Sequence, residues 1–321
     1  MKPRLTILAM LLTANLATAQ ANANPSQASG QSAPAQGQNS SKPAAPSNSQ
    51  IQPAGAGNRV LQAKSQDELK AYQDASAKTD PAEMLASADA FAAKYPASEL
   101  KGQLYIRAMT LYGQANNAEK IVESGRKAIA ADPTNPVPLV QVASVLAETT
   151  RDTDLDREQR LDEAAKDAQA AIDNINTGLI VPPNAPPEKV AAAKTSILTM
   201  AYDTLGMVNM NKKDFAAAEQ ALLKAADTSN ANPEAVVYLR LSVAQDQLKK
   251  YPQALDSANK AVQYAPQGSA ALNLAKQQQA RVQKLMEAGS ASNPATPAAS
   301  PVPAKPATAP PANTASPNTP H

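Results

Sequence analysis

The sequence has 321 residues, with 30 Lys and Arg against 28 Asp and Glu, giving a formal net charge of +2. This near-balance gives no electrostatic footprint for nucleic acid or for an anionic membrane surface. Cysteine is absent and the sole histidine is His321, which excludes thiol chemistry, an internal catalytic triad and most zinc sites. There is also no Gly-rich phosphate loop. We therefore expect a protein without enzymatic activity or a cofactor.

Residues 1–19 have the pattern of a secretory signal peptide. Lys2 and Arg4 form a charged start, Leu5 to Leu12 form an apolar run, and an Ala-Thr-Ala cleavage pattern ends at Ala19. The apolar run is shorter than the ~20 residues that a membrane-spanning helix needs. The sequence therefore predicts cleavage after Ala19 and an exported protein, either periplasmic or secreted.

Two further segments have the composition of disordered chain. Residues 20–58 are rich in Ala, Pro, Ser and Gln and contain one charged residue, Lys42, while Lys305 is the only Lys, Arg, Asp or Glu of residues 289–321. Neither segment has enough aromatic and branched side chains to offset the loss of chain entropy on folding. We expect a linker and a tail, which leave residues 59–288 to build one folded domain.

The first predicted helices begin with recognisable N-caps. Ser65 and Glu68 form a capping box in front of a helix over residues 66–77, and Asp80 precedes a proline that begins the next helix. A fuller unit of two helices runs from Gly102 to Asn135. Its marker residues are Tyr105, Ala108, Tyr112, Ile121, Gly125, Ala128 and Pro133.

The middle of the chain holds a degenerate unit with two inserted loops. Ala164, Ala168 and Ala171 keep the helical spacing, but residues 151–156 separate the two helices of this unit. Four acidic residues here have a spacing that echoes a calcium-binding loop, and they are Asp152, Asp154, Asp156 and Glu163. Arg157 stands where such a loop requires glycine, so the simpler interpretation is an acidic insertion before a helix.

The second insertion, Gly178 to Pro187, is apolar and rich in proline and precedes a long helix over residues 188–211. It either connects two helices, folds back onto the binding surface, or offers an extended strand to a partner.

The last two units carry the clearest pattern. The segment from Ala235 to Gly268 is 34 residues long, and its preceding unit has Tyr202, Leu205 and Gly206 in the first helix. We expect Asn232 and the following proline to cap the helix that begins the final unit. A more polar helix over residues 269–287 has the character of a terminal cap.

These units resemble the tetratricopeptide repeat in their length, spaced alanines and closing proline. The resemblance covers most of Ser65 to Gly268 and implies an all-α, right-handed superhelical stack of about five antiparallel helix pairs. The residues that pack the repeats are predicted to be Tyr105, Ala108, Tyr112, Ala128, Tyr202, Leu205, Gly206, Ala218, Ala225, Tyr238, Leu241, Ala254, Ala261 and Pro266.

In this family the concave groove is lined mainly by first helices. The corresponding positions here are Met200, Asp203, Met207, Met210, Val236, Leu239 and Val243. They lack the paired Lys and Asn residues with which related repeats clamp a terminal carboxylate, and an apolar, Met-containing groove suits an apolar or amphipathic partner. Alternatively, these residues contact the next helix and meet no ligand.

We therefore expect a scaffold that binds other proteins or peptides of the cell envelope. The main alternative is a self-assembling structural protein that uses the same apolar surfaces to form homo-oligomers. A carbohydrate-binding module is disfavoured because the chain has no tryptophan.

Overall fold

The computed structural model describes residues 59, 61–182 and 184–291. The predicted signal peptide, the whole linker over residues 20–58, and the tail from residue 292 lie outside this part. Within it the chain forms helices and one isolated parallel bridge between Arg59 and Ile180. The helices are α1 (Gln66–Ser76), α2 (Pro81–Lys94), α3 (Lys101–Gln114), α4 (Ala118–Ala131), α5 (Pro136–Thr149), α6 (Arg157–Asp173), α7 (Pro187–Asn211), α8 (Phe215–Thr228), α9 (Ala235–Gln247), α10 (Tyr251–Tyr264) and α11 (Ala270–Ala291).

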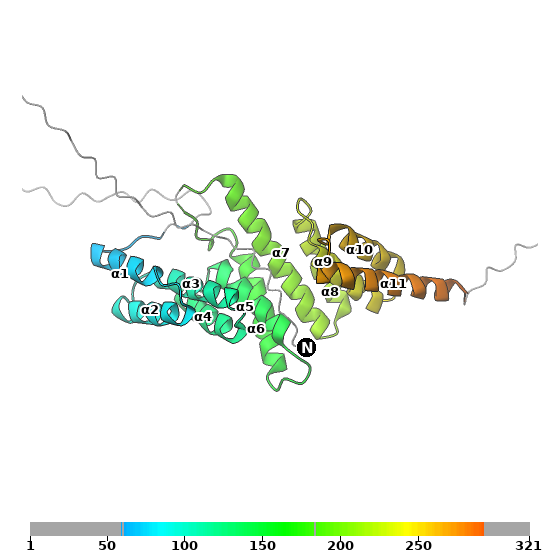
Figure 1. The fold of residues 1–321 in the computed structure, drawn as a ribbon, viewed down its shortest axis with the longest axis horizontal. Helices are drawn as coiled ribbons and strands as arrows, with labels where there is room; N and C mark the ends of the chain where they lie inside the picture. Colours follow the sequence, from blue (N-terminus) through cyan, green and yellow to red (C-terminus); the bar gives the residue numbers. More distant parts are fainter. Residues whose placement is uncertain (1–58, 60, 183, 292–321) are drawn as a thin grey trace, which may run out of the picture.

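The helices are arranged as five successive pairs followed by α11 (Figure 1). In each pair the first helix packs against the second, and the second packs against the first helix of the following pair. The predicted all-α stack of antiparallel helix pairs is confirmed. The first helices α5, α7 and α9 also contact one another in order, more closely than the second helices do. These first helices therefore lie along one side of the stack.

Helix α7 is the longest element and joins two parts of the core. It runs between the α1–α6 part and the α8–α11 part in Figure 1. Ile197 and Ala201, in its middle, pack in one cluster with α5, α6 and the loop before α7. Met207 and Val208, further along, belong to the largest cluster, which extends back to α1.

The helix starts follow the local sequence signals, with one exception. The Ser65 hydroxyl accepts a hydrogen bond from the backbone N–H of Glu68 at 3.1 Å, and the Asp80 carboxylate accepts from two backbone N–H groups at 2.9 Å. The predicted cap at Asn232 is wrong, because α9 begins at Ala235. The backbone N–H of Asn232 instead donates to the Ser229 carbonyl at 2.8 Å, so this residue continues the turn that ends α8.

The alanines predicted to pack the repeats are buried. Ala108, Ala128, Ala218, Ala225, Ala254 and Ala261 are at most 1% exposed. Tyr202 and Leu205 are only partly buried, and Pro266 is exposed. Among these packing residues the one glycine, Gly206, marks a close approach, because an added Cβ would lie 2.6 Å from Cγ of Leu222. The first and second helices of this pair are therefore as close as a glycine permits.

A tyrosine–lysine contact recurs in three helix pairs. The lysine Nζ lies 5.7 to 5.8 Å from the ring centroid, a cation–π geometry. The tyrosine comes from the first helix and the lysine from the second, 22 residues later in each case. The pairs are Tyr105 with Lys127, Tyr202 with Lys224, and Tyr238 with Lys260. In the third helix pair, α5 and α6, the position that corresponds to this lysine is Ala170, two residues after Ala168. This pair therefore lacks the tyrosine–lysine contact.

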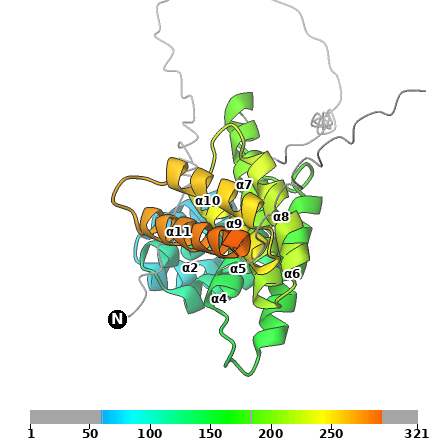
Figure 2. The same ribbon diagram turned by 90° about the vertical axis from the view of Figure 1, so that its right-hand side faces the viewer.

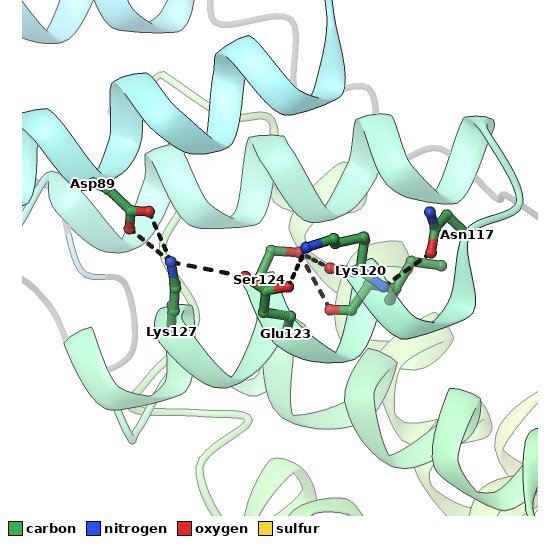
Figure 3. A network of polar contacts seen from close by, with 7 residues as sticks. Asp89, Asn117, Lys120, Glu123, Ser124 and Lys127 are labelled. Carbon is green, nitrogen blue, oxygen red and sulfur yellow. Dashed lines mark hydrogen bonds and ion pairs between the residues drawn. The ribbon is translucent and has the colours of Figure 1, made fainter.

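The first of these contacts belongs to a polar network on the second helices (Figure 3). Lys127 donates to both carboxylate oxygens of Asp89 at 2.8 and 2.9 Å, and the Tyr105 hydroxyl donates to the same carboxylate at 2.9 Å. Burial, with a smaller contribution from Asp89, raises the pKa of Tyr105 to about 12. Lys120 pairs with Glu123 at 2.6 Å on the same helix as Lys127. These contacts tie α2 to α3 and α4, which is a structural role.

Candidate functional site

The residues predicted to line the groove lie along one stripe each of α7 and α9. Their spacings of three, four and seven residues place them on one face of each helix. From α7 come Met200, Asp203, Met207 and Met210, and from α9 come Val236, Leu239 and Val243. We call this surface, together with Glu148 at the end of α5, the first-helix face.

The methionines contribute more to the core than to an open surface. Met207 is 8% exposed and belongs to the largest core cluster. Met200 and Met210 are partly buried against two other clusters. Val236, at 37% exposed, is the large apolar side chain of the seven that is most open to solvent. Met207 therefore makes its contacts with neighbouring helices.

A charged cluster joins three successive first helices on this face. Arg240 of α9 forms an ion pair with Asp203 of α7, and its guanidinium lies 3.9 Å from the carboxylate of Glu148 on α5. The side chains are partly or largely shielded, with exposed fractions of 23% for Arg240, 15% for Asp203 and 31% for Glu148. The cluster therefore sits where three repeats meet.

The carboxylate of Glu234 also interacts electrostatically with Asp203 and Arg240. Burial, together with the charge of Asp203, raises the pKa of Glu234, whereas Arg240 lowers it. Burial likewise raises the pKa of Glu148, which Asp203 raises further and Arg240 opposes. The pKa of Asp203 itself is raised by burial despite its pairing with Arg240. Arg240 is thus in contact with two carboxylates, and its charge also acts on the third, so one cation faces three acidic groups.

The cluster also has an unused hydrogen-bond acceptor. Oδ1 of Asp203 is inaccessible to solvent and accepts no hydrogen bond from the described part of the chain. Thr199 lies one helical turn earlier on the same stripe of α7, is 1% exposed, and its hydroxyl also has no hydrogen-bond partner there. Buried polar groups are usually paired, so both atoms are exceptions to that rule within the described residues.

The acidic residues of the predicted calcium loop form separate contacts with other groups of the protein. Glu163 forms a two-bond pair with Arg126 at 2.6 and 2.7 Å. Asp152 accepts from Arg157 at 3.2 Å, and Asp154 accepts from the backbone N–H of Arg151 at 2.8 Å. Among the described residues no group of three or more His, Cys, Asp or Glu side chains could hold a metal ion. The residues of this insertion form a projecting loop between α5 and α6 (Figure 2).

The loop over residues 178–187 packs against α5, α6 and α7. Leu179 and Val181 are buried in the cluster formed with α5, α6 and α7. The backbone of this loop pairs with Arg59, whose guanidinium donates to Asp132 at 2.7 Å. A Cβ at Gly178 would lie 1.8 Å from the Thr134 carbonyl oxygen, so this position requires glycine. The loop is a packed connector.

A pocket of about 550 Å³ lies on the other side of the stack. It is lined by residues of α8, α9 and α10, among them Leu223, Tyr238 and Lys260. Leu223 is 38% exposed, close to the value for Val236 on the first-helix face. Substitutions at Leu223 and Val236 can therefore be compared to test the two sides of the molecule.

Of the charged cluster, sequence reasoning placed only Asp203 on the binding surface. Glu148, Glu234 and Arg240 were missed, because each belongs to a different helix pair or to the loop between pairs. One signal was available: Arg240 follows Leu239 on the stripe of α9, where a cation among apolar residues needs a partner.

None of the described helices combines the length and hydropathy of a membrane span. No family model matches the chain, and no curated protein sequence matches it.

Several solved structures match parts of this chain at low sequence identity and low TM-score. Two crystal structures of MamA match at 15% and 14% identity with TM-scores of 0.38 and 0.35, covering 60% and 57% of this chain and 91% and 96% of those chains. Acl4, the assembly chaperone of RpL4, matches at 12% identity with a TM-score of 0.33, covering 70% of this chain and 99% of that one. The APC/C hetero-tetramer Cut9–Hcn1 matches at 14% identity with a TM-score of 0.31, covering 67% of this chain and 42% of that one.

Proposed function

We propose that this chain is a non-enzymatic scaffold that binds a segment of a partner protein on the first-helix face of α5, α7 and α9. The observation that carries the proposal is the composition of this face. It brings the exposed Val236 and the half-buried Leu239 and Val243 beside an incompletely paired charged cluster. Apolar anchors with a few convergent polar groups are typical of a peptide-binding surface.

The rigidity of the stack supports the same role. Each of the helices α5, α7 and α9 is fixed by buried contacts with its neighbours, so the face is formed before a partner arrives. Preformed surfaces leave the ordering cost of binding mainly to the partner.

We further propose that the scaffold acts in the cell envelope, either in the periplasm or after secretion. This proposal depends on the signal-peptide pattern of residues 1–19.

The test is affinity capture from envelope extract with the full chain, read by mass spectrometry and repeated with the purified partner. Val236→Glu puts a charge on the first-helix face, and Leu223→Glu puts the same charge at an equally exposed position on the other side. We expect Val236→Glu to abolish partner capture and Leu223→Glu to preserve it. Thermal melting of both variants checks that the fold is intact.

Two results would contradict the proposal. Loss of capture only in Leu223→Glu would place binding at the pocket between α8 and α10. If the parent chain retained only copies of itself, and its mass in solution rose with concentration, the chain would be a self-assembling protein.

A further inference from the structure

The charged cluster of the first-helix face is short of one cation. Glu148, Asp203 and Glu234 come from α5, α7 and the segment before α9, and Arg240 opposes the charge of all three. In the described part of the chain, Arg240 is the only cation among the charges that act on these carboxylates. An isolated scaffold therefore holds like charges close together in partly desolvated positions, which is unfavourable.

The hydrogen bonding of the cluster points to the same deficit. Arg240 reaches one oxygen of Asp203, while Oδ1 of Asp203 and the hydroxyl of Thr199 are buried without a partner in the described residues. A lysine ammonium carries three donors and an arginine guanidinium carries five, so either head group could donate to more than one of the exposed carboxylate oxygens of the cluster.

The surroundings restrict how such a cation could arrive. Val236 is exposed at one end of the α9 stripe, and Val243 lies two turns further along, on either side of Arg240. A partner residue with an apolar stem and a charged tip fits this arrangement, since the stem can lie on the valines while the tip reaches the carboxylates.

We propose that Glu148, Asp203 and Glu234 select a lysine or arginine side chain of the bound partner segment, flanked by apolar residues. This inference rests on the proposed function and names the specificity of the same surface. The partner is thus an amphipathic, basic segment, and an acidic segment is rejected by like-charge repulsion.

The experiment selects from a display library of random 12-residue peptides on the full chain. The test variant is Glu148→Gln with Glu234→Gln, which keeps the Asp203–Arg240 pair and the side-chain sizes. Its matched control is Glu99→Gln with Glu119→Gln, which removes two exposed carboxylates elsewhere and gives the same net charge. We expect the parent and the control to enrich peptides with a Lys or Arg between apolar residues, and the test variant to lose that preference.

Affinity measurements then quantify the effect. In a selected peptide, replacing the basic residue by Gln should weaken binding to the parent about tenfold or more, the range of a charge-assisted contact in a partly buried site. The same replacement should change binding to the Glu148→Gln, Glu234→Gln variant little.

Several outcomes would overturn the inference. Selected peptides without a basic residue, or a basic preference that survives in the test variant, would sink it while leaving the scaffold proposal intact. Failure to enrich any peptide class on the parent would count against both. If deletion of residues 292–321 tightened peptide binding and Lys305→Gln did the same, the chain's own tail would be the occupant.

Discussion

Gly206 shows how much of this fold depends on single small residues. A Cβ at this position would lie 2.6 Å from Cγ of Leu222, a fully buried side chain on the partner helix. Because contacts this short do not occur, Gly206→Ala must displace Leu222 or separate α7 from α8. We expect a loss of about 1–3 kcal/mol in the free energy of unfolding, the usual cost of overpacking.

The control for that substitution is Gly113→Ala on α3. No heavy atom lies within 4 Å of a Cβ built there, so the change should stabilise the protein by up to about 1 kcal/mol through helix propensity. Denaturant unfolding of both variants measures the difference. Equal stability of the two would contradict the close packing of α7 on α8.

Asp167 gives a prediction about pH. Burial raises its pKa to about 6, with a smaller contribution from Glu163. Between about pH 4 and pH 6 the folded chain therefore binds more protons at this group than the unfolded chain does, and the contribution of Asp167 to stability is lost as the pH rises. Asp167→Asn should raise the free energy of unfolding by about 1–2 kcal/mol at pH 7.5 and leave it nearly unchanged at pH 4.

Asp173→Asn, an exposed position on the same helix, is the matched control for that prediction. Thermal melts of the two variants across this pH range separate the cases. A gain for Asp167→Asn that is equal at both pH values would mean that its protonation is not the cause.

At the scale of elements, α11 takes the place that a sixth first helix would occupy. Leu272, Ala275 and Val282 bury its inner face, and Arg281 and Gln278 donate to the buried carboxylate of Asp246 on α9 at 2.7 and 3.2 Å. We expect Arg281→Met to lower the melting temperature, because the Asp246 charge loses its cation. Lys284→Met on the same helix, an exposed position, should have little effect; equal melting curves for the two variants would argue against the capping contact.

Most elements were predictable from the sequence, because each depends on residues close along the chain. The capping box at Ser65, the cap at Asp80 and the spaced alanines are local signals, and the helices they predict are present. The predicted terminal helix was placed over residues 269–287, whereas α11 extends to Ala291. Leu274 of this helix is 53% exposed, whereas Ala275 is buried.

Contacts between helix pairs were not predictable in the same way. The loops inserted before α6 and α7 make the spacing of the pairs irregular, so the sequence does not reveal which residue of α5 meets which residue of α9. The proximity of Glu148 to Arg240, across 92 positions of sequence, arises only when the stack has formed. The methionines predicted for the groove illustrate the same limit, because helix periodicity does not distinguish a stripe open to solvent from one covered by the next helix.

For the whole molecule, the boundary of the folded domain can be tested by truncation. Deletion of residues 292–321 should leave the thermal transition unmoved, since their composition offers little apolar surface to bury. Deletion of residues 270–321 should lower it, because Val237, Ala261 and Asp246 would lose the cover of α11. A large drop after the shorter deletion would show that the tail docks on the stack.

The recurrence of the tyrosine–lysine contact bears on how such a chain grows during evolution. Helix pairs α3–α4, α7–α8 and α9–α10 carry this contact at the same interval of 22 residues. Because the tyrosine and the lysine both lie within one helix pair, a duplication of α9–α10 would copy the stabilising contact together with the two helices. The α5–α6 pair carries an insertion and no such contact, so it cannot be copied or lost as freely. On this argument, changes in array length are expected on either side of α5 and α6 rather than within this pair.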